Sequence, residues 1–159
     1  KNAAEGLNYG AEISLDSEIS DTVNMFLNLG ILKTEIRKYQ SRPDLEGREQ
    51  AHAPDFSFST GLSWEISNNL EILLDVTGKS DFYYSDSHDN RSNDYLLTNM
   101  NLIFEKDNIN LNFWVRNIFD QYYSLRGFYF GNEPPNFEDT LYERHGDPRN
   151  YGVSFRYDF

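Results

Sequence analysis

The sequence of 159 residues contains no cysteine, and its basic residues are few. The absence of cysteine excludes disulfide bonds and thiolate metal sites. Lysine and arginine number 14 against 26 aspartate and glutamate, and the formal net charge of −12 argues against a nucleic-acid partner. No apolar run approaches the ~20 residues that a membrane-spanning helix needs, so any membrane crossing must use strands.

Aromatic residues are abundant in this otherwise polar chain. They make up 16% of the sequence, while the hydrophobic fraction is only 38% and the mean hydropathy is −0.69. A transmembrane β-barrel has this composition because one strand face in two meets lipid and aromatic girdles mark both interfaces. An acidic soluble β-sandwich with an aromatic core has it as well, so composition leaves both classes open.

The end of the sequence alternates strictly between apolar and polar side chains. Because successive side chains of a strand point to opposite faces, residues 151–159 predict a strand with one wholly apolar face. An alternation that reaches a terminal aromatic residue is typical of the end of a transmembrane β-barrel. The apolar face consists of Tyr151, Val153, Phe155, Tyr157 and Phe159.

The same alternation predicts six further strands, which makes about seven in all and an all-β fold. No helical period extends over a useful length. Most of the strands have ten or more residues, which suits a tilted membrane crossing better than an average soluble strand. The six ranges are Leu7–Leu15, Val23–Tyr39, Asp55–Ser67, Leu70–Tyr84, Tyr95–Glu105 and Ile109–Ile118.

Short and long connections alternate along the predicted strands. Turns at 17–22, 68–69 and 106–108 alternate with polar loops at 40–53, 85–93 and 120–147. Short turns at one end and long loops at the other are a property of antiparallel up-and-down membrane barrels. Seven strands cannot close into an antiparallel barrel, and Lys1–Ala4 carry neither Met nor a secretion signal. We therefore expect residues 1–159 to be part of a longer protein.

Three segments near the end of the sequence resemble motifs of TonB-dependent outer-membrane receptors. Val115–Tyr123, with Asn117-Ile118-Phe119-Asp120, is similar to that family's Asn-Leu-Phe-Asp motif in the penultimate strand, with Ile118 in place of Leu. Gly146–Ser154 resembles the Gly-x-Pro-Arg-x-Tyr-Gly segment that enters the last strand. Phe155–Phe159 is similar to the terminal signal read by the barrel-assembly machinery, and Leu7–Glu12 more weakly resembles a strand start.

This resemblance implies a fold, a location and a function. Residues 1–159 would supply about seven carboxyl-terminal strands of a 22-stranded barrel in the bacterial outer membrane, without the amino-terminal plug. Such receptors import scarce solutes with energy from the TonB complex, which acts through the plug. Ferric siderophores are the expected cargo, with cobalamin, haem and oligosaccharides as alternatives. The resemblance implies neither a cofactor nor a catalytic residue.

Candidate ligand contacts lie in the long loops, where aromatic rings and arginine would suit a large anionic chelate. For Tyr83 and Tyr84 an aromatic girdle at the membrane interface is the favoured alternative, and for Phe128–Phe130 the alternative is packing of the loop on itself. Arg149 is expected to anchor the last loop to the barrel rim. The candidates are Tyr83, Tyr84, Arg126, Phe128, Tyr129, Phe130, Tyr142 and Arg144.

The polar strand face is expected to line the barrel lumen and to pair with the plug, because confined charges need partners. Its residues are Glu12, Glu65, Glu71, Asp75, Asn99, Asn101, Asn110, Asn112, Arg116 and Arg156. The alternative is that these residues simply solvate the channel wall, which is the ordinary role of lumen residues.

Three other possibilities concern function classes. His88 lies in Asp86-Ser87-His88-Asp89, which could hold a divalent cation, although no ligand spacing repeats. His145 could serve as the base of an outer-membrane hydrolase, but no serine is marked as its nucleophile. A soluble carbohydrate-binding β-sandwich would show two facing sheets, whereas the receptor predicts a single curved sheet with an apolar outer band.

Overall fold

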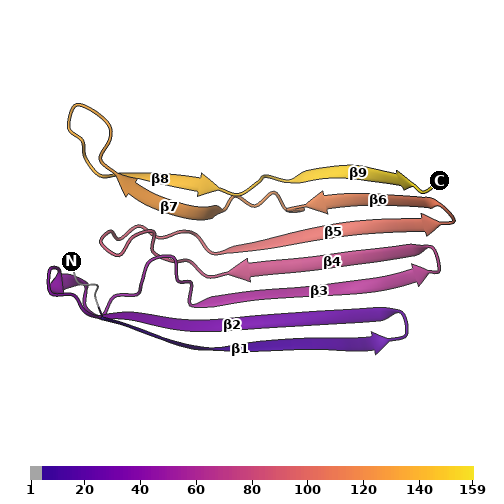
Figure 1. The fold of residues 1–159 in the computed structure, drawn as a ribbon, viewed down its shortest axis with the longest axis horizontal. Coiled ribbons are helices and arrows are strands. Elements are labelled where there is room, and N and C mark those ends of the chain that lie inside the picture. The colour runs from indigo at the N-terminus through magenta and orange to yellow at the C-terminus, as the bar shows by residue number, and fades with distance from the viewer. Residues whose placement is uncertain (1–4) are drawn as a thin grey trace.

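The computed structural model describes residues 5–159, and Lys1–Ala4, on which part of the expectation of a longer protein depended, lie outside them. Seven strands form one antiparallel sheet in the order β1-β2-β3-β4-β5-β6-β9, and β7 and β8 form a separate hairpin (Figure 1). A 3-10 turn, η1, spans Pro43–Leu45. The strands are β1 Glu5–Ser20, β2 Val23–Lys38, β3 Phe56–Ser67, β4 Leu70–Lys79, β5 Tyr95–Lys106, β6 Ile109–Arg116, β7 Ser124–Phe130, β8 Thr140–His145 and β9 Asn150–Tyr157.

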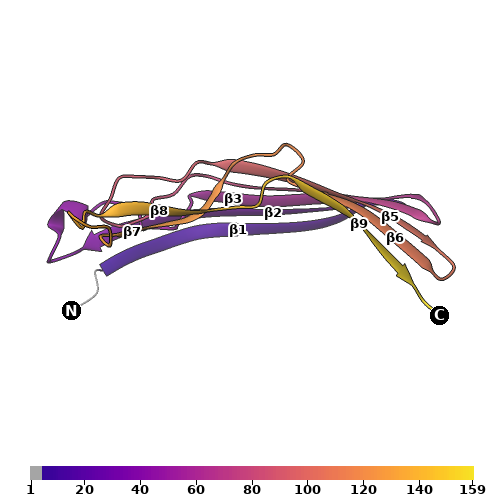
Figure 2. The ribbon, with the colours of Figure 1, turned by 90° about the horizontal axis from the view of Figure 1, so that it is seen from above.

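The main sheet confirms the predicted meander of seven strands. Each strand pairs with its neighbour in an antiparallel register, and Figure 2 shows the sheet curved rather than flat. It does not form two facing layers, which a β-sandwich would require. Within residues 5–159, no helix is long and apolar enough to cross a membrane.

Connection lengths are sorted between the two ends of the sheet, as predicted. Turns at 21–22, 68–69 and 107–108 lie at one end, and the connections at 39–55, 80–94 and 117–149 lie at the other (Figure 1). Asp107 adopts a positive φ of 52°, which a two-residue hairpin requires and which aspartate tolerates. The first turn is shorter than predicted because β1 remains paired with β2 as far as Ser20.

The strand register places the apolar residues on one continuous face. Leu62 of β3 pairs with Leu74 of β4, and Leu74 pairs with Met100 of β5. At the sheet edge formed by β9, Phe113 of β6 pairs with Val153, and Phe155 is 65% exposed. A one-residue slip anywhere would move a strand's apolar set to the wrong face, so this register selects a single two-faced sheet.

Several predicted strands are shorter in the structure, and the last one ends at Tyr157 rather than at Phe159. The fourth ends at Lys79 rather than Tyr84, because β3 begins at Phe56 and offers no partner beyond this point. Ser80 closes the ladder, since its amide donates to the Phe56 carbonyl over 2.9 Å. The sixth strand ends at Arg116 rather than Ile118, where Asn117 turns the chain at a positive φ of 50°.

The predicted loop at 120–147 is wrong in part, because it contains the hairpin β7–β8. The run of three aromatics in Phe128–Phe130 has no period of two, and a nine-residue connection with Pro134 and Pro135 separates the strands. These features hide the hairpin from pattern analysis. It pairs with no strand of the main sheet.

Buried apolar side chains lie at the long-loop end of the molecule. Ile36, Leu45, Phe82 and Tyr84 are each at most 5% exposed. Thr34 and Ile36 continue the polar face of β2, so the loops pack over the polar side of the sheet. This small core stabilises the packed connections on the polar side of the sheet.

Candidate functional site: the packed loops

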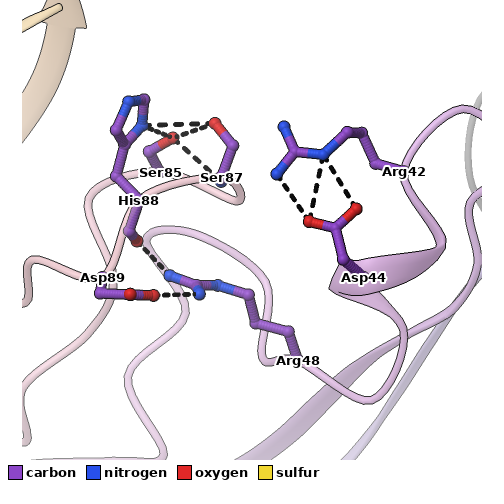
Figure 3. Close-up of polar contacts among 7 residues, drawn as sticks. All are labelled: Arg42, Asp44, Arg48, Ser85, Ser87, His88 and Asp89. Carbon is purple, nitrogen blue, oxygen red and sulfur yellow. Dashed lines mark hydrogen bonds and ion pairs between the residues drawn. The ribbon is translucent and has the colours of Figure 1, made fainter.

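Salt bridges join the loop at 39–55 to the loop at 80–94. The Arg48 Nη1 atom lies 2.6 Å from Asp89 Oδ1, and its Nη2 donates to the backbone carbonyl of His88 (Figure 3). Arg91 also forms two ion pairs. Its Nη2 atom lies 3.0 Å from Glu49 Oε2 in the other loop, and its Nε atom lies 2.5 Å from Asp81 Oδ2. The Arg48–Asp89 and Arg91–Glu49 pairs cross between the two loops, whereas Arg91 and Asp81 share one loop, and so do Arg42 and Asp44 (Figure 3).

Tyr83, a candidate ligand contact, lies between two arginines. The guanidinium carbons of Arg48 and Arg91 lie 4.0 and 4.1 Å from its ring centroid. Burial lowers the pKa of Arg91, but its hydrogen bonds to Tyr83 and Asp81 outweigh this effect and raise the pKa above its usual value. Two cation–π contacts therefore engage the Tyr83 ring within the loops.

Tyr84 is buried beneath the hairpin. Only 4% of the residue is exposed, and its hydroxyl donates to Glu143 of β8. Burial and this hydrogen bond raise the pKa of Tyr84 to about 12. A Cβ atom on Gly127 would lie 2.6 Å from the Tyr84 ring, so the glycine lets β7 approach the ring closely. Tyr84 thus joins the loop at 80–94 to both hairpin strands.

Tyr129 makes a second contact between the hairpin and this loop. Its ring stacks on His88 with centroids 3.6 Å apart and an interplanar angle of 8°. Burial raises the pKa of the Tyr129 hydroxyl. The Nε2 atom of His88 lies 3.6 Å from Oδ2 of Asp139, the last residue of the hairpin's connecting segment. His88 is therefore enclosed by the hairpin and its own loop.

The remaining five candidates share the opposite face of the hairpin. Arg126 pairs with Arg144 and Phe128 with Tyr142 in the strand register, and Phe130 follows on the same side. The Phe128 and Tyr142 rings stack with centroids 5.9 Å apart at 20°, and Phe130 meets Phe128 edge-on at 5.1 Å. Phe128 is 39% exposed and Phe130 is 50% exposed, so this face is open.

The segments that resemble receptor motifs meet at the base of the hairpin. Asn117 is buried, and its side chain donates to the Gln121 carbonyl over 2.9 Å and to the Asp147 carbonyl over 3.1 Å. Asp120 Oδ1 accepts a 2.7 Å hydrogen bond from the Arg149 amide. The Arg149 side chain also donates to the Ile118 carbonyl over 3.5 Å, so it lies at the base of the loop, and its anchoring role stays a prediction.

Several of the predicted lumen residues pair with each other on the polar face. Asn99 donates to Asp75 over 2.7 Å, and Arg116 Nη1 lies 3.8 Å from the same carboxylate. Ser63 donates to Glu71 over 2.6 Å. The sheet therefore satisfies part of its polar face through cross-strand contacts.

The three histidines occupy different settings. The His145 Nε2 atom lies 2.7 Å from the Tyr122 hydroxyl, while His88 Nδ1 lies 3.0 Å from Ser85 Oγ (Figure 3). Burial and nearby Arg126 lower the pKa of His52. Among residues 5–159, no group of three or more metal-ligating His, Cys, Asp or Glu side chains gathers.

Sequence reasoning missed the residues that assemble the loops. Arg48, Arg91 and Glu143 carried no local signal, because their partners lie 40 or more residues away or in another loop. Gly127 was the available clue, since a glycine within an aromatic run marks a close approach.

No protein-family model matches the chain. Solved structures do match it along almost its whole length. The ferric yersiniabactin uptake receptor FyuA from Yersinia pestis aligns over 99% of this chain with a TM-score of 0.83 and 18% identity. The siderophore receptor PiuA from Acinetobacter baumannii aligns over 98% with a TM-score of 0.82 and 15% identity. The ferric-catecholate import receptor Fiu from Escherichia coli K12 aligns over 98% with a TM-score of 0.76 and 14% identity.

These similarities establish the fold. The seven-stranded sheet has the same fold as a barrel segment of these receptors, which is the fold that the sequence resemblance implies. The aligned part covers 24%, 22% and 21% of those three receptors, so the chain spans about a quarter of their length or less. All three are receptors for siderophores or ferric chelates by name.

Proposed function

We propose that this chain is the carboxyl-terminal barrel segment of an outer-membrane receptor that imports a ferric siderophore. The observation that supports this proposal best is the two-faced sheet, whose fold is shared with siderophore receptors over 98% or more of the chain. Its apolar face would lie against outer-membrane lipid, and its polar face would line the lumen. Phe155 and Val153 belong to the lipid side, and Asp75 belongs to the lumen side.

In this proposal the chain acts as wall and vestibule, and none of its residues is catalytic. A ligand would bind at the packed loops and then pass through the lumen after rearrangement of a plug driven by the TonB complex. The apolar residues of β9 and Phe159 would form the signal for the barrel-assembly machinery. The loop contacts proposed for the ligand are drawn from the eight candidates, of which the five on the open hairpin face are accessible.

The test is uptake of radioactive iron by cells that lack the full-length gene, measured under iron starvation. Ferric catecholate, ferric hydroxamate and ferric citrate would be supplied separately, in strains with and without TonB. We expect one chelate to lose uptake both in the gene deletion and in the TonB deletion. Normal uptake of all three would contradict siderophore import and direct the search to cobalamin, haem or an oligosaccharide.

A further inference from the structure

The open face of hairpin β7–β8 holds two arginines directly opposite each other. Arg126 and Arg144 are register partners, both are exposed, and neither forms an ion pair within residues 5–159. Like charges at directly opposed positions destabilise an antiparallel pair. The chain carries 26 acidic residues, yet none of those described lies within ion-pair distance of either arginine.

Three other loop arginines form ion pairs. Arg42 pairs with Asp44, Arg48 pairs with Asp89, and Arg91 pairs with two carboxylates. The two hairpin arginines have no such partner among residues 5–159, and their repulsion gives the protein alone no benefit. A bound anion would remove the repulsion and supply the missing partner.

A stacked aromatic pair follows the arginines along the same face. Phe128 and Tyr142 are the next register pair, with nearly parallel rings, and Phe130 extends the surface beyond them. The Tyr142 hydroxyl donates to Glu133 over 2.6 Å, which orients this ring and raises the pKa of the hydroxyl. An aromatic ring of a ligand could stack here with its charged group toward the arginines.

The hairpin is held in place from behind. Tyr84 packs against Gly127 and bonds to Glu143, and Tyr129 stacks on His88, all on the face opposite the arginines. One face of the hairpin therefore attaches it to the loop at 80–94, and the face with the two arginines is exposed. A pre-oriented surface loses little conformational entropy when it binds a ligand.

We propose that this face, formed by Arg126, Arg144, Phe128, Tyr142 and Phe130, binds an aromatic ring that carries a carboxylate or phenolate. The inference deepens the proposed function, on which it rests, by naming the ligand chemistry of the loops. Tyr83, Tyr84 and Tyr129 are the scaffold of this surface and make no ligand contact.

The test measures binding of salicylate to the purified full-length receptor in detergent, by saturation-transfer NMR titration. Two related probes separate the contributions, because benzamide has the ring without the charge and cyclohexanecarboxylate has the charge without the aromatic ring. We expect both to bind at least about tenfold more weakly than salicylate. Equal binding of either probe, or no saturable binding of salicylate, would overturn the proposal.

The variant Arg126→Gln/Arg144→Gln should weaken salicylate binding by about tenfold or more, and Arg126→Lys/Arg144→Lys should retain part of it. Arg42→Gln is the matched control, since it removes one loop charge away from the hairpin and should change binding less than about twofold. Thermal unfolding of the double Gln variant should be unchanged or occur at a higher temperature, because a repulsion is removed. Unaltered binding in this variant would refute the role of the arginines.

Uptake assays distinguish this inference from the proposed function. If iron uptake depends on the receptor but survives in the double Gln variant along with salicylate binding, only the hairpin inference fails. If salicylate binding requires the arginines but the receptor imports no ferric chelate, only the proposed function fails.

Discussion

The side chain of Asn117 joins the end of β6 to the segment that leads into β9, by donating to the Asp147 carbonyl over 3.1 Å. Asn117 also accepts a 2.9 Å hydrogen bond from the Gln121 amide, and its own amide donates to Asn99 of β5. One residue therefore connects the end of β6, a residue within β5 and the segment before β9 at the base of the hairpin. The two segments that most resemble receptor motifs are in contact through it.

Asn117→Ala should destabilise the base of the hairpin. The substitution leaves the Gln121 amide and two carbonyls without partners, and losses of this kind cost on the order of 3 kcal/mol. Hydrogen exchange should rise throughout residues 117–149 and remain unchanged in the turn at 68–69. Asn117→Gly keeps the positive φ accessible, so equal exchange in the wild type and the Gly variant would show that only the backbone conformation matters.

Phe155→Asp should block assembly of the full-length receptor, whereas Ser154→Asp should be tolerated. Phe155 lies on the apolar face opposite Leu111, and Ser154 lies on the polar face opposite Asn112. A carboxylate on the lipid side would cost on the order of 2 kcal/mol and disrupt the proposed assembly signal. The amount of folded receptor in outer-membrane fractions measures the effect, and equal amounts of both variants would contradict the face assignment.

Gly127→Ala should separate the hairpin from the loop at 80–94. The added methyl group would lie 2.6 Å from the Tyr84 ring, a distance that real side chains do not adopt. We expect faster hydrogen exchange in both segments and loss of salicylate binding. Tyr84→Ala in the same chain makes room for the methyl group and should restore part of the protection against hydrogen exchange. If exchange stays fast in the double variant, the clash with the Tyr84 ring is not the cause.

Alkaline pH should weaken the attachment of the hairpin. The pKa of Tyr84 is raised from 10.0 to about 12, so the folded state holds this proton more tightly than the unfolded state. The resulting stabilisation is complete below pH about 10 and is lost as the pH rises toward about 12. Thermal unfolding across this window measures the loss, with Tyr84→Phe as the control. An identical pH dependence in the Phe variant would assign the effect to another group.

The alternation of side chains determined the fold class, the number of strands in the main sheet and which residues share each face. These properties are local, since side chains of a strand alternate with a period of two and short turns have their own residue preferences. Leu62, Leu74 and Phe155 could therefore be assigned to one face from the sequence alone.

Tertiary structure decided how the loops are organised. The hairpin β7–β8 has no regular alternation and is stabilised by contacts with residues 80–94, which lie more than 30 residues earlier in the chain. Tyr84 and Phe128 are both aromatic loop residues, yet one is buried by Gly127 and the other is open. Their difference depends on which distant segment covers each ring, and no local pattern encodes that packing.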